Sequence, residues 1–368
     1  MNKTLIRTIS IKLDVDVHET ALQETQEQFN AAASWVASVC WEEGITNTNT
    51  AHHRVYDETR SRFGLGAQLA VCARAKAVEA IKATRAKKSE ACPQFGARGS
   101  IRYDARTYRL MSLDRVSLNT LHGRVICRMI LGKRQHDMLT DPLWTIGGAD
   151  LTWRGGTYYL NVTQNKDAPE LTETEATLGV DLGIVQLATD STGESFSGAK
   201  VHEVRMRYHK RRQELQRVGT RSAKRRLKKL SGREKRFQKD TNHCIAKTLV
   251  QKAVVSCKAL ALEDLTAIRE RVTVRHENRY ERHCWAFFQL RVYIAYKAAW
   301  ASVPVRFVDP RNTSRTCHMC KHCEKANRQS QASFKCKQCG FCCNADYNAA
   351  INISRASVKV PLGTSVRG

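Results

Sequence analysis

The sequence predicts an α/β protein in two parts: a β-rich first half with a helical insertion, and a mixed second half that carries clustered cysteines. Three observations lead to this prediction. Apolar and polar residues alternate in residues 1–16 and again in much of residues 100–164, as in half-buried strands. Between them, residues 18–87 are Ala-rich with helical spacing. In the second half, short apolar strands alternate with long helical segments.

Composition narrows the class of function. The 368 residues suffice for roughly two domains, and the formal net charge is +26. Such an excess of positive charge is typical of proteins that bind nucleic acid or an anionic membrane. The membrane is disfavoured, because no apolar run is long enough to span a bilayer and the N-terminus resembles a strand rather than a signal peptide. We therefore expect a cytoplasmic protein with a nucleic-acid partner and no membrane partner.

Turn signals divide the first half from the second. Gly155-Gly156 joins two alternating runs, which predicts a tight hairpin. The polar stretch 165–177 contains Pro169 and predicts a domain boundary. Beyond it, residues 177–198 predict a three-strand meander, and residues 201–255 predict long basic helices. The remaining predicted elements are a strand ending at 260–264, a helix at 282–300, a strand at 304–309 and a helix at 344–354. In the predicted helix at 282–300, one face carries Trp285, Phe288, Val292 and Tyr296, and we interpret this face as core.

Paired cysteines near the C-terminus predict a zinc ribbon. Seven of the 14 cysteines lie between Cys317 and Cys343. Two of the pairs are Cys317-x2-Cys320 and, after a gap of 15 residues, Cys336-x2-Cys339, the spacing of a closed, structural four-cysteine site. Cys323, Cys342 and Cys343 also lie at metal spacing, so the ligand set stays open at this point.

Three carboxylates form the second constellation. Asp181 and Glu263 each end an apolar strand, and Asp346 begins a helix. Each alone has an ordinary explanation, a solvated turn or a favourable charge at a helix N-terminus. Their order along the chain, strand, meander, basic helices, strand and helix, is the layout of an RNase H-like nuclease core. Clustered carboxylates repel one another unless cations neutralise them, and two Mg²⁺ ions would do so while activating water for attack on a phosphodiester.

Basic residues supply candidate phosphate contacts. In the stretch 205–239 acidic partners are sparse, which favours contact with a polyanion over a solvated helix. The candidates are Arg211, Arg212, Arg221, Lys224, Arg225, Arg226, Lys228 and Lys229. In the stretch 99–110, Arg102 and Tyr103 are candidates for holding a phosphate and stacking on a base, although aromatic–Arg alternation also builds ordinary strands.

Taken in order, LGVDLG, LALEDL, TSRTCHMC, FKCKQCG and NADYNAAINI resemble the transposon-encoded TnpB family, compact relatives of type V CRISPR effectors. The resemblance is strongest over residues 177–354. It implies a β-rich wedge domain at 1–16 and 97–170, a helical recognition region at 17–96, a RuvC-like nuclease domain at 171–310 and 344–368, and a zinc ribbon at 311–343. Asp181, Glu263 and Asp346 fall on the catalytic positions of the family, and Cys317, Cys320, Cys336 and Cys339 on its zinc positions.

The implied activity is RNA-guided cleavage of double-stranded DNA beside a short adjacent motif, by a monomer bound to its transposon-derived guide RNA. Two alternatives remain open: an RNA-guided DNA-binding protein that does not cleave, and an RNase H-like transposase that transfers DNA strands. A plain zinc-ribbon regulator would leave Asp181 and Glu263 unexplained.

Overall fold

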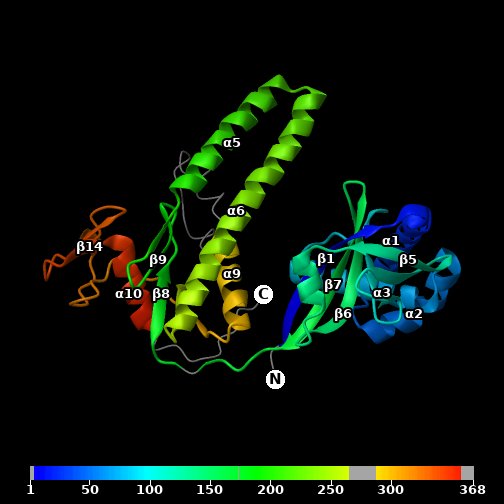
Figure 1. The fold of residues 1–368 in the computed structure, drawn as a ribbon, viewed down its shortest axis with the longest axis horizontal. Coiled ribbons are helices and arrows are strands. Elements are labelled where there is room, and N and C mark those ends of the chain that lie inside the picture. The colour runs from blue at the N-terminus through cyan, green and yellow to red at the C-terminus, as the bar shows by residue number, and fades with distance from the viewer. Residues whose placement is uncertain (1–3, 173, 265–286, 358–368) are drawn as a thin grey trace. The chain divides into compact units, whose positions relative to one another are not determined.

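The chain forms two compact units, Met1–Asp167 and Ala168–Gly368 (Figure 1). The computed structural model describes residues 4–172, 174–264 and 287–357. No helix in these ranges is both long enough and apolar enough to cross a membrane.

The first unit contains a seven-stranded antiparallel sheet in the order β2-β6-β7-β1-β5-β4-β3. Its strands are β1 (Thr4–Asp14), β2 (Ile101–Tyr103), β3 (Tyr108–Leu110), β4 (Arg115–Thr120), β5 (Gly123–Ile130), β6 (Thr145–Arg154) and β7 (Thr157–Asp167). The predicted first strand is therefore confirmed. The predicted hairpin is confirmed too: β6 and β7 pair up to Arg154 and Thr157, and Gly155 and Gly156 between them both have positive φ, which glycine adopts without strain.

Three long helices cover one face of this sheet. They are α1 (Glu19–Glu42), α2 (Thr48–Phe63) and α3 (Ala67–Ala86). The short helix η1 (Asp16–His18) contacts α1, and the short helix α4 (Lys133–Leu139) contacts β1. Alternation along β1 buries Ile9, Ile11 and Leu13 in a core that also contains Phe29 of α1 and Leu69 of α3. The helical insertion predicted for residues 18–87 is thus confirmed, and its helices pack against the apolar face of the sheet.

The second unit is built on a five-stranded sheet in the order β10-β9-β8-β11-β12. β8, β9 and β10 are an antiparallel meander, as predicted, whereas β11 and β12 run parallel to β8. The strands are β8 (Thr177–Asp181), β9 (Gln186–Asp190), β10 (Ser195–Ser197), β11 (Ala259–Glu263) and β12 (Val305–Val308). The helices are α5 (Ala199–Val218), α6 (Arg221–Val255), α9 (Phe287–Trp300) and α10 (Ala345–Ser357).

Helices cover both faces of this mixed sheet. In β11, Leu260 and Leu262 join a core with residues of α6 and α9, while Ala261 between them packs with Ile353 of α10 on the opposite face. α6 reaches this core with its second half, from Phe237 onward. Its basic first half pairs with α5 in a long hairpin (Figure 1).

One predicted core face in α9 is wrong. Phe288 is 68% exposed and Val292 39% exposed, whereas Leu290, Ile294 and Ala298 are buried in the core. α9 is apolar around much of its circumference, so the spacing of its apolar residues does not select a face. Trp285 lies outside the described residues.

Along the chain, the cysteine-rich segment connects β12 to α10. It contains the 3-10 helix η2 (Lys325–Asn327) and a two-stranded antiparallel ribbon, β13 (Ser333–Lys335) and β14 (Cys342–Asn344). Its core is small, with Cys317, Phe334, Cys336 and Ala345 buried together. A core of this size needs additional stabilisation, which a bound metal would supply.

Candidate active site and zinc centre

The topology brings the three predicted carboxylates to one region. Asp181 and Glu263 are the last residues of β8 and β11, which are parallel neighbours with Leu262 opposite Val180. Because parallel strands end at the same edge of a sheet, these two side chains leave the sheet together. Asp346, in the first turn of α10, is the third and is only 6% exposed.

Close backbone contact fixes α10 against β8. A Cβ atom on Gly179 would lie 2.1 Å from the carbonyl oxygen of Ala350 and 2.5 Å from the amide nitrogen of Ser354, so only glycine permits this approach. The Ser354 hydroxyl donates a hydrogen bond of 2.9 Å to the carbonyl of Thr177. The strand that carries Asp181 and the helix that carries Asp346 are therefore in direct contact.

All three carboxyls have raised pKa values. Burial, followed by the negative charges of Glu263 and Asp346, raises the pKa of Asp181 to about 8. Burial also raises the pKa of Glu263 and the pKa of Asp346. The buried Asp346 and the half-buried Asp181 and Glu263 thus form a site that favours either protons or bound cations.

Arg328, which the sequence reasoning did not single out, reaches this site from the cysteine-rich segment. Its Nη2 atom donates a hydrogen bond of 3.2 Å to Oδ1 of Asp346, and its charge lowers the pKa of all three carboxyls, although burial has the larger, opposite effect. The hydroxyl of Thr313, from the same segment, donates a hydrogen bond to Glu263. Neither residue belongs to a spacing pattern, so only the three-dimensional structure identifies them.

The chemistry of the donor set fits Mg²⁺. Carboxylate oxygens are the hard ligands that Mg²⁺ prefers. Within the described ranges, four cysteines are the only group of three or more Cys, His, Asp or Glu side chains whose ligand atoms all lie within 4.8 Å of one another, so the three carboxylates are spread more widely.

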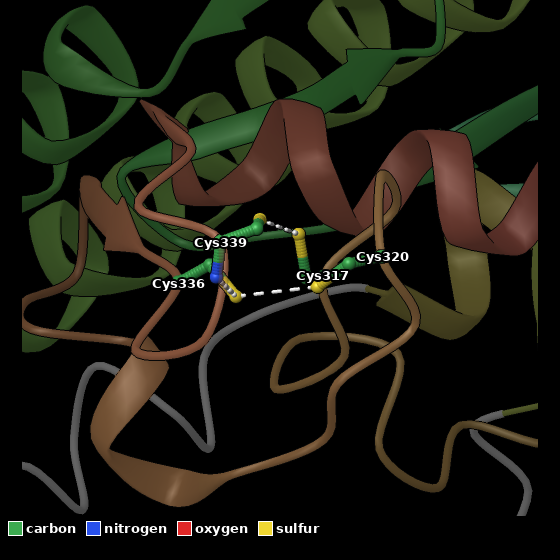
Figure 2. Close-up of side chains that lie close together, drawn as sticks. All are labelled: Cys317, Cys320, Cys336 and Cys339. Atoms are coloured by element: carbon green, nitrogen blue, oxygen red, sulfur yellow. Dashed lines mark hydrogen bonds between the residues drawn. The ribbon is translucent and has the colours of Figure 1, made fainter.

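These four cysteines are Cys317, Cys320, Cys336 and Cys339 (Figure 2). The sulfur atoms of Cys317 and Cys339 are 3.7 Å apart and those of Cys320 and Cys336 are 3.5 Å apart. Tetrahedral zinc with bonds of about 2.3 Å places its sulfur ligands about 3.8 Å from one another. The residues present thus fit zinc in number, type and spacing.

The other thiols of this segment are separate from the four-cysteine group. Cys323 and Cys342 are exposed and Cys343 is half-buried, and none of them belongs to the group. Backbone geometry favours Cys336 as a ligand: although burial opposes the change, hydrogen bonds from the amides of Cys339 and Gln338 lower the pKa of its thiol to about 6. The ligand set left open by the spacing is thereby narrowed to these four sulfur atoms.

Two asparagines attach the cysteine-rich segment to α10. Oδ1 of Asn348, which is fully buried, accepts hydrogen bonds from the backbone nitrogen of His318 (3.1 Å) and from its Nδ1 (3.0 Å). Nδ2 of Asn348 donates to the carbonyl of Thr316 at 2.8 Å, and Nδ2 of Asn352 donates to the carbonyl of Thr313 at 2.9 Å. The zinc centre and the carboxylate site therefore share one helix.

The predicted basic candidates lie in the α5–α6 hairpin. All of them except Arg212 are exposed, and Arg212 forms an ion pair with Glu234. The exposed candidates are Arg211, Arg221, Lys224, Arg225, Arg226, Lys228 and Lys229.

The predicted stacking role of Tyr103 is contradicted. Tyr103 is 1% exposed and its hydroxyl donates to the carbonyl of Asn119, so its ring is core and no base can reach it. Arg102 is partly exposed and forms a two-pronged ion pair with Glu79, at 2.7 and 2.8 Å. The alternation of Arg and Tyr in this stretch belongs to a half-buried edge strand.

Comparison with known proteins agrees with this architecture. A family model described as probable transposase matches residues 159–268, and a model of the Cas12f1-like TNB domain matches residues 287–353. A solved structure of a Cas12f1 complex with single guide RNA and target DNA superposes with a TM-score of 0.68, covering 95% of this chain and 99% of that one at 14% identity. The fold is therefore that of the compact Cas12-type effectors.

Curated relatives include TnpB-like and Cas12f proteins. The chain is 36% identical over 135 residues to the TnpB-like protein MJ0751 of Methanocaldococcus jannaschii, covering 36% of this chain and 48% of the relative. It is 28% identical over 232 residues to the CRISPR-associated endodeoxyribonuclease Cas12f1 of Sulfoacidibacillus thermotolerans, covering 58% and 54%. The chain is therefore similar to TnpB-like and Cas12f proteins, and it spans about half the length of these curated relatives.

Proposed function

We propose that the protein is an RNA-guided, Mg²⁺-dependent DNA endonuclease. The observation that carries the proposal is the meeting of Asp181, Glu263 and Asp346 at one buried, mutually repelling site on a mixed sheet. Antiparallel β10-β9-β8 followed by parallel β11 and β12 is the strand order expected of an RNase H-like, RuvC-type nuclease. Metal-assisted phosphodiester hydrolysis is the chemistry such a site supports.

Asp181, Glu263 and Asp346 would hold the metal ions, which when bound activate water and stabilise the leaving oxygen of an in-line displacement. Thr313 orients Glu263 through its hydroxyl. Arg328 partly offsets the three negative charges, and its guanidinium is placed to contact a phosphate oxygen beside Asp346. Burial keeps the carboxylates in a low-dielectric site, where their attraction for cations is strengthened.

The proposed partners are a guide RNA and double-stranded target DNA. The named relatives support this, since one is an endodeoxyribonuclease and the superposed Cas12f1 is bound to guide RNA and target DNA. The net charge of +26 and the exposed cations of the α5–α6 hairpin supply the electrostatic attraction for two polyanions. Sequence would be read by base pairing with the guide, and the protein would read only a short adjacent motif.

The domain roles belong to the same proposal. We assign the seven-stranded sheet to a wedge domain, α1 to α3 to a recognition region, and the four-cysteine segment to a structural zinc ribbon. Zinc would tie the two knuckles and so position Arg328 and Thr313 beside the carboxylates. The working location would be the nucleoid, where the target DNA lies.

Cleavage by the purified protein with its co-purifying RNA tests the proposal. We expect matched DNA to be cut in Mg²⁺ and not in EDTA. Asp181→Ala should abolish cutting while RNA binding persists, and Asp137→Ala, on the exposed α4, should cut normally. Matched DNA that is bound but never cut by the wild type would instead indicate a binding protein. Cleavage by Asp181→Ala at the normal rate would overturn the assignment of the site.

A further inference from the structure

Asn344 stands at the junction between the cysteine-rich segment and α10. It is the last residue of β14, and α10 begins at the next residue, Ala345. Its main chain belongs to the ribbon, because Asn344 pairs with Ser333 of β13 and the amide of Ala345 donates to the carbonyl of Ala332 at 3.0 Å. The candidate metal ligand Asp346 follows two positions later. Asn344 itself is exposed.

The side chain of Asn344 caps α10. Its Oδ1 atom accepts hydrogen bonds from the backbone nitrogen of Asp346 at 2.9 Å and from that of Tyr347 at 3.1 Å. The first amides of a helix lack partners inside the helix, and Asn is among the residues that satisfy them best. One of the two amides belongs to Asp346, so the cap fixes the main chain of the residue that supplies the third carboxylate.

Arg328 holds the same residue by its side chain. Nη2 of Arg328 donates to Oδ1 of Asp346 at 3.2 Å and to the carbonyl of Gln331 at 3.0 Å, while its Nε donates to the carbonyl of Ser330 at 3.4 Å. The ribbon thus contacts Asp346 at two points, its carboxylate through Arg328 and its amide through Asn344. Asp346 is only 6% exposed, so its carboxylate has little room to recover its place if the first turn of α10 shifts.

Many helix caps only stabilise their helix, and α2 provides the comparison. Its cap, Asn47, is likewise an exposed asparagine, and its Oδ1 atom accepts from the backbone nitrogens of Asn49 at 2.8 Å and Thr50 at 3.3 Å. The two caps therefore match in residue type, exposure and hydrogen-bond pattern. They differ in what the capped turn carries, since α2 holds none of the candidate metal ligands.

We propose that Asn344 is a positioning residue of the carboxylate site: by capping α10 it orients the Asp346 carboxylate toward the metal ions that Asp181 and Glu263 would also hold. The inference rests on the proposed function and deepens it, because it names a residue through which the ribbon sets the affinity of the site for Mg²⁺. Groups that orient a metal ligand from outside the coordination sphere typically change metal affinity by about 10- to 100-fold when they are removed. Loss of a purely structural cap lowers stability alone.

Three variants of the full-length protein test the proposal. Asn344→Ala removes the cap, Asn344→Ser restores a side-chain oxygen at the same position, and Asn47→Ala removes the matched cap of α2. The melting temperature of each variant is measured in EDTA and through a titration with Mg²⁺ at pH 8, and its zinc content is measured by elemental analysis. Because Mg²⁺ bound elsewhere affects all variants alike, differences between the titrations report the carboxylate site.

In EDTA we expect Asn344→Ala and Asn47→Ala to melt about 2–4 °C below the wild type, as the loss of one cap requires. Mg²⁺ should then separate them. The curve of melting temperature against log Mg²⁺ concentration should move to about 10-fold higher concentration in Asn344→Ala and stay in place in Asn47→Ala and Asn344→Ser. The zinc content of all three variants should equal that of the wild type, because none of the changes removes a thiol of the four-cysteine group.

An unshifted Mg²⁺ curve in Asn344→Ala, a shift that Asn344→Ser does not reverse, or loss of zinc from Asn344→Ala would overturn the proposal. Cleavage gives a second comparison, in which the Mg²⁺ concentration for half the maximal rate should rise about 10-fold in Asn344→Ala alone. A wild type that binds Mg²⁺ but cuts no DNA would contradict the proposed function, and the titration would still decide the role of Asn344. A wild type that cuts DNA, with the same Mg²⁺ dependence in Asn344→Ala, would contradict only the role of Asn344.

Discussion

Single residues decide the charge balance of the candidate active site. Asp181, Glu263 and Asp346 have raised pKa values, and Arg328 is a cation that opposes the rise at each of them. Arg328 brings one positive charge to three carboxyls, so in the absence of metal the site is electrostatically strained at neutral pH. The strain makes the stability of the metal-free protein depend on pH.

We expect Asp181→Asn to raise the melting temperature of the metal-free protein at pH 8 but not at pH 4. A folded-state pKa of about 8 lies above the ordinary value of 3.8, so the stability linked to this carboxyl is present below about pH 4 and is lost as pH rises through 8. Asp181→Asn has no carboxyl to ionise at this position, so it does not lose this stability as the pH rises. A gain of about 1–2 kcal/mol corresponds to roughly 2–6 °C.

Calorimetry at pH 4, 6 and 8 in EDTA measures this difference. Adding Mg²⁺ at pH 8 should stabilise the wild type more than the variant, because the ions offset the repulsion. Glu203→Gln, an exposed carboxylate in α5, serves as the control and should follow the wild type at every pH. Parallel pH profiles for wild type and Asp181→Asn would contradict the prediction.

Gly179→Ala should damage the site without touching a carboxylate. The new methyl group would overlap the carbonyl of Ala350 and the amide of Ser354, both backbone atoms of α10. Displacing α10 moves Asp346 away from Asp181, so we expect a destabilisation of about 1–3 kcal/mol and at least a tenfold loss of cleavage. In Gly232→Ala, the atom nearest to the new methyl group is the end of the flexible Arg236 side chain. This variant should therefore keep the stability and the cleavage activity of the wild type. Wild-type cleavage by Gly179→Ala would contradict the spacing argument.

At the scale of secondary-structure elements, α10 connects the carboxylate site to the cysteine-rich segment. We expect Asn348→Ala to separate the two, because it leaves the buried backbone nitrogen of His318 without its acceptor. The free energy of unfolding should fall by about 1–3 kcal/mol. Cleavage should fall, since Arg328 loses its fixed position, while zinc content by elemental analysis should stay near that of the wild type.

Cys339→Ser provides the comparison, because it should lose zinc as well as stability. Asn49→Ala, in an exposed turn of α2, should change neither the zinc content nor the stability. If Asn348→Ala cleaves at the wild-type rate, the attachment of the ribbon to α10 has no bearing on the chemistry.

The elements of both units could largely be predicted from the sequence, because their signals are local. Period-two alternation identified β1 and the β6–β7 hairpin, and continuous apolar runs before Asp181 and Glu263 identified β8 and β11. Features that depend on tertiary packing could not be predicted from the sequence. The buried side of α9 is set by what lies against it, and Tyr103 is buried because helices cover its sheet.

The same distinction applies to the site. The cysteine spacing and the order of the three carboxylates are visible along the chain, because metal knuckles and strand ends have local patterns. Arg328 and Thr313 contribute through contacts across 18 and 50 residues, and no spacing rule links them to their partners.

For the whole molecule, the net charge of +26 favours binding of a polyanion such as the proposed guide RNA. We expect the purified protein to carry RNA, and digestion of that RNA to lower the melting temperature by several degrees, because a ligand that binds only the folded state stabilises it. Absorbance at 260 and 280 nm before and after digestion measures the bound RNA, and parallel unfolding scans measure the melting temperature. Sequencing the bound RNA separates a defined guide from random RNA, and an unchanged melting temperature after complete digestion would contradict the expectation.

The position of Asp346 has a consequence for synthesis of the protein. Asp181 and Glu263 leave the ribosome well before the ribbon and α10, which carry Arg328 and Asp346. Under the proposed mechanism, a nascent or prematurely terminated chain that already displays its basic hairpin still lacks the third carboxylate and cannot cut. The order of translation thus delays the proposed nuclease activity until the ribbon and α10 have been made, which would protect the cell from chains that stop before them.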